Sequence, residues 1–127
     1  MRLAALGAML LVASGCARRG VILDHDGGID DYVAMVMVLA SGERDVRGVT
    51  IAFGDSYPDQ AVDATERLLA HYGARVPVGE CGPALRGKNE FPAAWRARSA
   101  AVAKLPAFAR QGASRQTGDA VAVLRRA

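Results

Sequence analysis

The fold of this chain is decided by one stretch, residues 20–41, which reads GVILDHDGGIDDYVAMVMVLAS. The apolar run at residues 21–23 indicates a short buried strand. Gly27 and Gly28 then allow a tight turn, and the apolar run at residues 32–40 indicates a helix with an acidic residue at or near its N-cap. A strand, a glycine turn and a helix in immediate succession are typical of one unit of an α/β protein.

The rest of the chain repeats this alternation. An α/β class follows, with a mostly parallel sheet and helices packed on its faces. A hydrophobic content of 51% in 127 residues is consistent with one globular domain. The later elements that we expect are a strand over residues 46–53, a helix over 59–71, a strand over 76–79 and the start of a helix over 118–125.

Four carboxylates fall within eight positions of the chain: Asp24, Asp26, Asp30 and Asp31. The two-residue period of a strand puts Asp24 and Asp26 on one face at its carboxyl end, the edge where ligands bind in parallel sheets. Carboxylates this close repel one another unless a cation compensates, and hard oxygen ligands favour calcium or magnesium over zinc. We therefore expect Asp24, Asp26 and Asp31 to be metal ligands. The alternative is a strand and a capped helix with solvated carboxylates.

Two further residues belong to this expected edge. Asp55 follows the second strand in Phe53-Gly54-Asp55, where it is either part of the site or an ordinary turn residue. His25 alternates with Asp24 and Asp26, so its side chain should face the other way and contribute packing or support.

The octapeptide Asp24-His25-Asp26-Gly27-Gly28-Ile29-Asp30-Asp31 resembles the DxDxxxDD signature of the inosine-uridine-preferring nucleoside hydrolases, which cleave the N-glycosidic bond of ribonucleosides. The resemblance implies that Asp26 is a calcium ligand and the catalytic base, that Asp31 is a second ligand and that Asp24 gives outer support. It also implies that Asp30 and Asp55 contact the ribose. Asp55 is a departure, because the family usually has Asn there, and a carboxylate accepts hydrogen bonds without donating any.

Two later segments also resemble the family. Residues 76–85 look like its third strand and following loop, and residues 90–96 look like a segment of some bacterial members, in which Trp95 either lines a base pocket or packs. The family's domain continues past this point into further metal-binding and acid residues. We therefore expect residues 20–127 to form the N-terminal portion of a Rossmann-like sheet with flanking helices, truncated and inactive or weak by itself.

The implied function is calcium-dependent hydrolysis of ribonucleosides, with a nucleoside as the small-molecule partner. One alternative is a lipid-anchored module that binds calcium or ribose without turnover. A second is a haloacid-dehalogenase-like phosphatase, whose nucleophile motif resembles residues 24–27. Gly28 and the Asp30-Asp31 pair depart from that phosphatase motif.

The N-terminus has the pattern of a bacterial lipoprotein. Arg2 precedes an apolar run at residues 3–13, and Ala13-Ser14-Gly15 precedes Cys16. This predicts a signal peptide over residues 1–15, a lipid on Cys16 and a tether over residues 16–19, hence an extracytoplasmic, membrane-anchored protein. The alternative is an uncleaved, cytoplasmic start.

The net charge of +3 hides an acidic first half and a basic second half. The basic residues are scattered in an alanine-rich background with few aromatic residues, so we expect no nucleic-acid binding. An open edge of a parallel sheet favours association, and we expect homo-oligomers on that ground.

Overall fold

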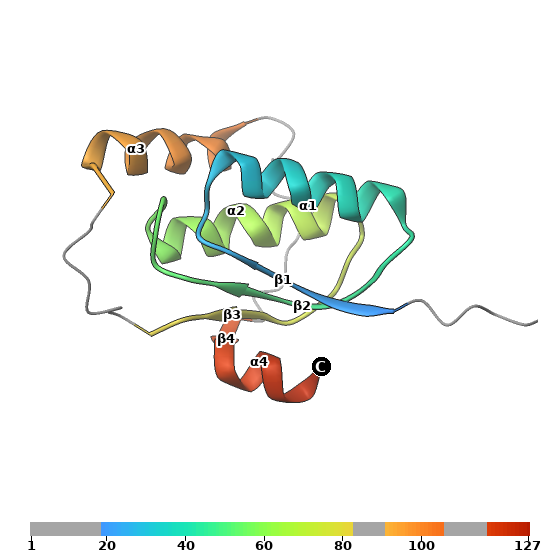
Figure 1. Cartoon of the computed structure of the whole chain (residues 1–127). Coiled ribbons are helices and arrows are strands. Elements are labelled where there is room, and N and C mark those ends of the chain that lie inside the picture. Colours follow the sequence, from blue (N-terminus) through green and yellow to red (C-terminus); the bar gives the residue numbers. More distant parts are fainter. Residues whose placement is uncertain (1–18, 83–90, 106–116) are drawn as a thin grey trace, which may run out of the picture.

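The computed structural model describes residues 19–82, 91–105 and 117–127 (Figure 1). Its four strands form one parallel sheet in the order β1-β2-β3-β4, which confirms the expected α/β class with flanking helices. Within these ranges no helix is long and apolar enough to cross a bilayer. In chain order the elements are β1 (Gly20–His25), α1 (Ile29–Ser41), β2 (Asp45–Ile51), α2 (Pro58–His71), β3 (Val78–Glu80), α3 (Ala93–Ala101), the 3-10 turn η1 (Val102–Lys104), β4 (Thr117–Asp119) and α4 (Ala120–Arg126).

The helices form a layer on each side of the sheet. Because the strand order follows the chain order, successive right-handed crossovers place α1 and α2 on the same face. Figure 1 shows α3 on that side as well and α4 on the opposite side. Helix α4 lies against β2 and β3.

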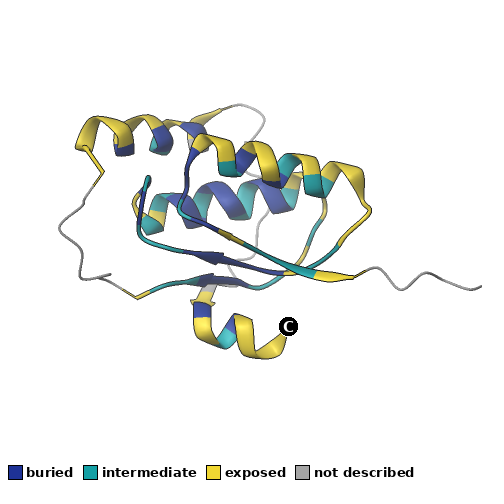
Figure 2. Ribbon diagram, in the orientation of Figure 1, coloured by how far each residue is buried: buried dark blue, intermediate teal, exposed yellow. Residues whose placement is uncertain are grey.

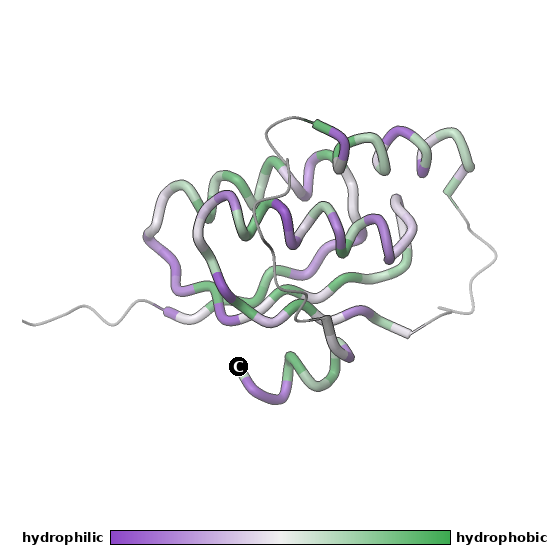
Figure 3. Tube along the Cα trace, turned by 180° about the vertical axis from the view of Figure 1, so that it is seen from behind, coloured by the Kyte–Doolittle hydropathy of each residue, from purple (hydrophilic) through white to green (hydrophobic). Residues whose placement is uncertain are grey.

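The hydrophobic core lies between the sheet and the α1–α2 layer. Figure 2 shows buried positions along β2 and along α2, while much of α1 and α4 is exposed. Helix α2 carries both hydrophilic and hydrophobic residues, as Figure 3 shows, because one of its faces packs on the sheet and the other meets solvent. The core residues are Tyr32, Met35, Val49, Ile51, Ala61, Val62, Ala64, Leu68, Leu69, Val78 and Val102.

The carboxyl ends of the four strands are in register. His25 pairs with Ile51, Ile51 with Glu80, and Glu80 with Asp119, so the four strands end along one line. Helix α3 lies over this edge of the layer in Figure 1. The loops that follow β1 and β2 therefore meet beneath α3, where the acidic residues of the sequence motif are found.

The strand expected over residues 46–53 ends earlier, at Ile51, and the strand expected over residues 76–79 lies at Val78–Glu80. The C-terminal helix also differs from the sequence prediction. The helix expected from residue 118 begins at Ala120, because residues 117–119 pair with β3 as the strand β4. Asp119 is the N-cap of α4, and its side chain accepts a hydrogen bond from the N–H of Ala122 at 3.1 Å. The predicted signal peptide and the predicted lipid site at Cys16 lie outside the described residues.

Candidate functional site

Backbone hydrogen bonds tie the β1–α1 loop to the β2–α2 loop. The N–H of Ala52 donates to the carbonyl of His25 at 2.8 Å, and the N–H of Ser56 donates to the carbonyl of Asp26 at 3.0 Å. These bonds extend the pairing of β1 with β2 past the ends of the strands. Asp26 is therefore fixed against the turn that contains Asp55.

The Asp26 carboxylate lies directly against Gly54. A Cβ atom at position 54 would be 2.1 Å from Asp26 Oδ2, so this approach requires glycine. The N–H of Asp55 donates to the same oxygen at 3.2 Å. Burial raises the pKa of Asp26; the Asp55 N–H opposes this rise, and the neighbouring Asp31 carboxylate adds to it. Asp26 is thus a partly buried carboxylate with a second carboxylate beside it.

Asp31 caps helix α1 from within its first turn. Its Oδ2 accepts the N–H of Gly28 at 2.9 Å and the N–H of Asp26 at 3.3 Å. Gly28 is the N-cap residue, so the acidic cap comes from Asp31. A Cβ at Gly28 would meet Asp30 Oδ1 at 2.6 Å, Asp31 Oδ2 at 3.2 Å and Asp55 Oδ2 at 3.3 Å. We call Asp26, Asp30, Asp31 and Asp55 the acidic cluster.

Asp24 makes its contact elsewhere. Its exposed side chain accepts a hydrogen bond from Thr50 Oγ1 of β2 at 2.5 Å. In the ranges that the structure describes, no three His, Cys, Asp or Glu side chains are grouped so as to hold a metal ion. The structure therefore brings Asp26 and Asp31 together, and it places Asp24 on the strand beside Thr50.

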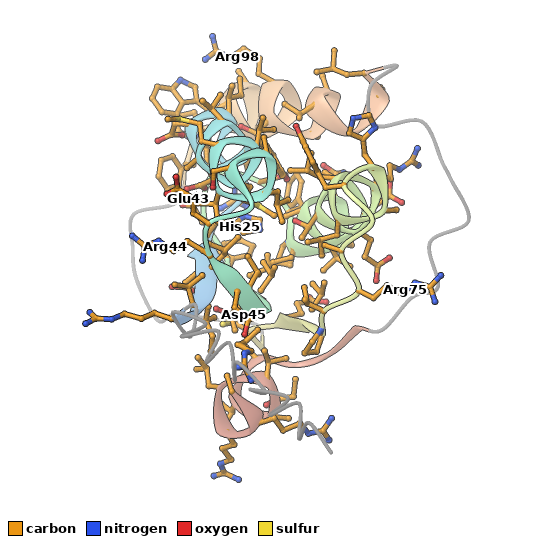
Figure 4. All side chains as sticks on the ribbon, turned by 90° about the vertical axis from the view of Figure 1, so that its right-hand side faces the viewer. His25, Glu43, Arg44, Asp45, Arg75 and Arg98 are labelled. Atoms are coloured by element: carbon orange, nitrogen blue, oxygen red, sulfur yellow. The ribbon has the colours of Figure 1, made fainter. Side chains whose placement is uncertain are left out.

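His25 supports the turn from the opposite side of β1. It is 6% exposed, its Nδ1 accepts the N–H of Gly27 at 3.1 Å, and its Nε2 lies 3.0 Å from Thr65 Oγ1. Because Nδ1 is the acceptor, Nε2 carries the proton and donates to Thr65. Burial lowers the pKa of His25, which agrees with a neutral ring. Figure 4 shows His25 between the helices and the sheet, which confirms its predicted role in packing and support.

A pocket of about 290 Å³ opens between α3 and the acidic cluster. Asp55 enters it from the β2–α2 turn; its Oδ2 accepts a hydrogen bond from Ser99 Oγ at 2.9 Å, and its Oδ1 is buried without a partner. Trp95 is 49% exposed, so it forms a wall of the pocket rather than part of the core. Arg98 projects outward from α3 in Figure 4. The lining residues are Ile29, Asp30, Asp55, Trp95, Arg98 and Ser99.

The sequence predicted Asp30, from the DxDxxxDD motif, and Asp55, from the turn after the second strand, at this place, but not Ser99 or Arg98. Ser99 lies 44 residues from its partner Asp55. A lone serine within an alanine-rich helix has no spacing that would indicate such a contact. Only the packing of α3 over the strand ends brings it to the acidic cluster.

Comparison with known proteins identifies relatives of this chain. The family model described as inosine-uridine preferring nucleoside hydrolase matches residues 21–123. A pyrimidine-specific ribonucleoside hydrolase RihA of Photobacterium profundum is 34% identical over 68 residues, which cover 54% of this chain and 22% of that protein. A probable uridine nucleosidase 2 of Arabidopsis thaliana is 41% identical over 64 residues, which cover 50% of this chain and 20% of that protein.

The fold has a counterpart among solved structures. The crystal structure of an inosine-uridine preferring nucleoside hydrolase from Bacillus anthracis superimposes with a TM-score of 0.68 at 24% identity. The superposition covers 87% of this chain and 38% of that one, so the chain spans well under half of the relatives that it matches. Because the family model covers most of the chain, from β1 into α4, the chain belongs to the inosine-uridine preferring nucleoside hydrolase family.

Proposed function

We propose that this chain carries the ribose- and metal-binding part of a nucleoside hydrolase site, which cleaves the N-glycosidic bond of ribonucleosides with calcium. The observation that carries the proposal is the shared pocket of Asp30 and Asp55, next to the Asp26–Asp31 pair. The names of the relatives refer to pyrimidine ribonucleosides and to uridine. Uridine is therefore the first substrate to test.

The chemistry of Asp26 and Asp31 fits a hard divalent cation. Two neighbouring carboxylates, one of them with a raised pKa, are a site of uncompensated negative charge that calcium would neutralise. When bound there, calcium would orient and activate a water molecule. Two carboxylates supply only part of the roughly 6–8 oxygens that calcium takes, so water, backbone, ribose or residues elsewhere complete the shell.

In this proposal Asp26 takes a proton from the attacking water. Burial raises its pKa, which moves it toward the range where a carboxylate is an effective general base. The hydrogen bond from the Asp55 N–H fixes one carboxylate oxygen and leaves the other for the water. Asp24 accepts a hydrogen bond from Thr50 and so stabilises the end of β1, directly before Asp26.

The pocket suits a nucleoside. Asp55 Oδ1, buried without a partner, is an acceptor for a ribose hydroxyl, and Asp30 supplies a second carboxylate. The indole of Trp95 and the side chain of Ile29 give an apolar surface for the base. A sugar with two hydroxyl donors and a flat base matches this combination of acceptors and apolar wall.

A second candidate is binding of calcium and ribose without turnover. Among the described residues that line the pocket, Asp30 and Asp55 are acceptors, and none is a histidine or tyrosine that could protonate the departing base. Membership in the nucleoside hydrolase family argues against the phosphatase alternative.

Calcium titration of the whole chain by calorimetry, followed by a uridine hydrolysis assay, separates these functions. The key variant is Asp26→Ala with Asp31→Ala, and the control is Asp45→Ala with Asp63→Ala, which removes two carboxylates that form ion pairs with arginines elsewhere. Calcium binding that is lost only in the key variant, with uridine cleaved by the wild type, supports the hydrolase. Binding without cleavage favours the second candidate, and a folded wild-type chain that binds no calcium contradicts both.

A further inference from the structure

Two buried side chains of α3 contact the turn that carries Asp55. Arg96 and Ser99 lie one helical turn apart and are each 4% exposed. The guanidinium carbon of Arg96 is 4.2 Å from the centroid of the Phe53 ring and 5.0 Å from that of Tyr57. Ser99 donates its hydroxyl to Asp55 Oδ2 at 2.9 Å. Arg96 therefore contacts residues on both sides of Asp55 in the sequence, and Ser99 contacts Asp55 itself.

Arg96 forms no ion pair with the other described residues. Its Nε and Nη2 are buried without hydrogen-bond partners, and the ion pairs of the described residues involve other arginines. A buried guanidinium is costly, and the two aromatic faces offset only part of that cost. An apolar side chain could fill the same space. The guanidinium instead lies over the rings of Phe53 and Tyr57, which ties α3 to the turn that carries Asp55.

We infer that Arg96 and Ser99 are positioning residues that hold the Asp55 carboxylate for a ribose hydroxyl, an inference that rests on the proposed function. Ser99 fixes the orientation of the carboxylate through Oδ2 and leaves Oδ1 as the acceptor. Arg96 holds Phe53 and Tyr57, and with them the backbone on both sides of Asp55. The hydrogen bond from Ser99 also helps to explain how a carboxylate is tolerated in an already acidic cluster, because it satisfies one oxygen of Asp55.

The first test measures uridine affinity of the whole chain by calorimetry with calcium present. Ser99→Ala should weaken binding about fivefold, the effect of one hydrogen bond, and Arg96→Met should weaken it at least as much. Both effects should disappear when Asp55→Ala is already present, because the two residues act through Asp55. Arg96→Lys keeps the charge without the planar stack and should restore part of the affinity. Arg75→Met, which removes an exposed cation, is the control.

Effects of Arg96→Met or Ser99→Ala that persist in full beside Asp55→Ala would overturn the inference, because a general effect on folding does not depend on Asp55. Equal affinities of Arg96→Met and Arg75→Met would overturn it for Arg96. If Arg96→Met does not fold, Ser99→Ala tests the same carboxylate.

A double-mutant cycle in urea tests the contact independently of the proposed function. Ser99→Ala and Asp55→Ala should show coupling of about fivefold in the unfolding equilibrium constant. If the wild type binds no uridine while this coupling is present, the proposed function fails and the support of Asp55 by α3 stands. Absence of coupling rejects the inference whether or not the chain binds uridine.

Discussion

Replacing Gly54 with alanine tests whether Asp26 must lie against the β2–α2 turn in order to bind a metal. The added Cβ would be 2.1 Å from Asp26 Oδ2, 2.5 Å from its Cβ and 2.6 Å from its Cγ. Non-bonded carbon atoms prefer about 3.5–4.0 Å, so the Asp26 side chain has to move by about 1 Å. Rotation of the carboxylate relieves the contact with Oδ2 but not the contact with the Asp26 Cβ.

The backbone resists this movement, because the carbonyl of Asp26 accepts the N–H of Ser56 at 3.0 Å. Overpacking of this kind lowers the free energy of unfolding by about 1–3 kcal/mol. Displacement of a ligand by about 1 Å should also weaken calcium binding about 10–100-fold, the range seen when the support of a metal ligand is lost. We therefore expect Gly54→Ala to be less stable than the wild type and to bind calcium poorly.

Calorimetric titration with calcium and urea unfolding of the same samples measure both quantities. Gly82→Ala is the matched control, since no atom lies within 4 Å of its added Cβ. Unchanged calcium affinity in a destabilised Gly54→Ala protein would refute the role of Asp26 as a ligand. Unchanged stability and affinity together would refute the steric argument itself, because the turn would then have relaxed without cost.

The remaining predictions concern pH and the membrane. Burial lowers the pKa of His25 from its usual 6.5, so the unfolded chain takes up a proton more readily and stability should fall as pH drops below about 6.5. His25→Ala should remove this pH dependence in urea unfolding and cost about 2–3 kcal/mol, because it leaves the Gly27 N–H without a partner. The pKa of Asp26 is raised from 3.8, so protonation of Asp26 stabilises the folded state at low pH, and this stabilisation is lost as the pH rises. Asp26→Asn should therefore raise the thermal midpoint of unfolding at pH 7, measured by calorimetric scans without calcium. Cys16→Ser should move the protein from the membrane to the soluble fraction if Cys16 carries a lipid, and an unchanged fractionation would contradict the lipid anchor.

Local patterns in the sequence predict most of the fold and part of the site. The strands β1, β2 and β3, the helices α1 and α2 and the parallel pairing follow from apolar periodicity, and the DxDxxxDD spacing predicts that Asp26 and Asp31 lie beside the carboxyl end of β1. The strand β4 could not be predicted in this way, because Thr117-Gly118-Asp119 has no apolar residue. It is a strand only because β3 offers an edge for pairing.

Asp24 shows how far the periodicity argument extends. Alternation along a strand predicts a shared face for Asp24 and Asp26 only while the chain remains extended, and β1 ends at His25, between the two residues. Asp24 therefore keeps the orientation of the strand, and its side chain accepts a hydrogen bond from Thr50 on the neighbouring strand. Asp26 belongs to the loop, and its side chain lies against Gly54 and Asp55. The end of the sheet thus separates a supporting carboxylate from those of the acidic cluster. The fourth member of the cluster, Asp55, comes from the β2–α2 turn, and its hydrogen-bond partner Ser99 comes from α3, two segments that the motif does not contain.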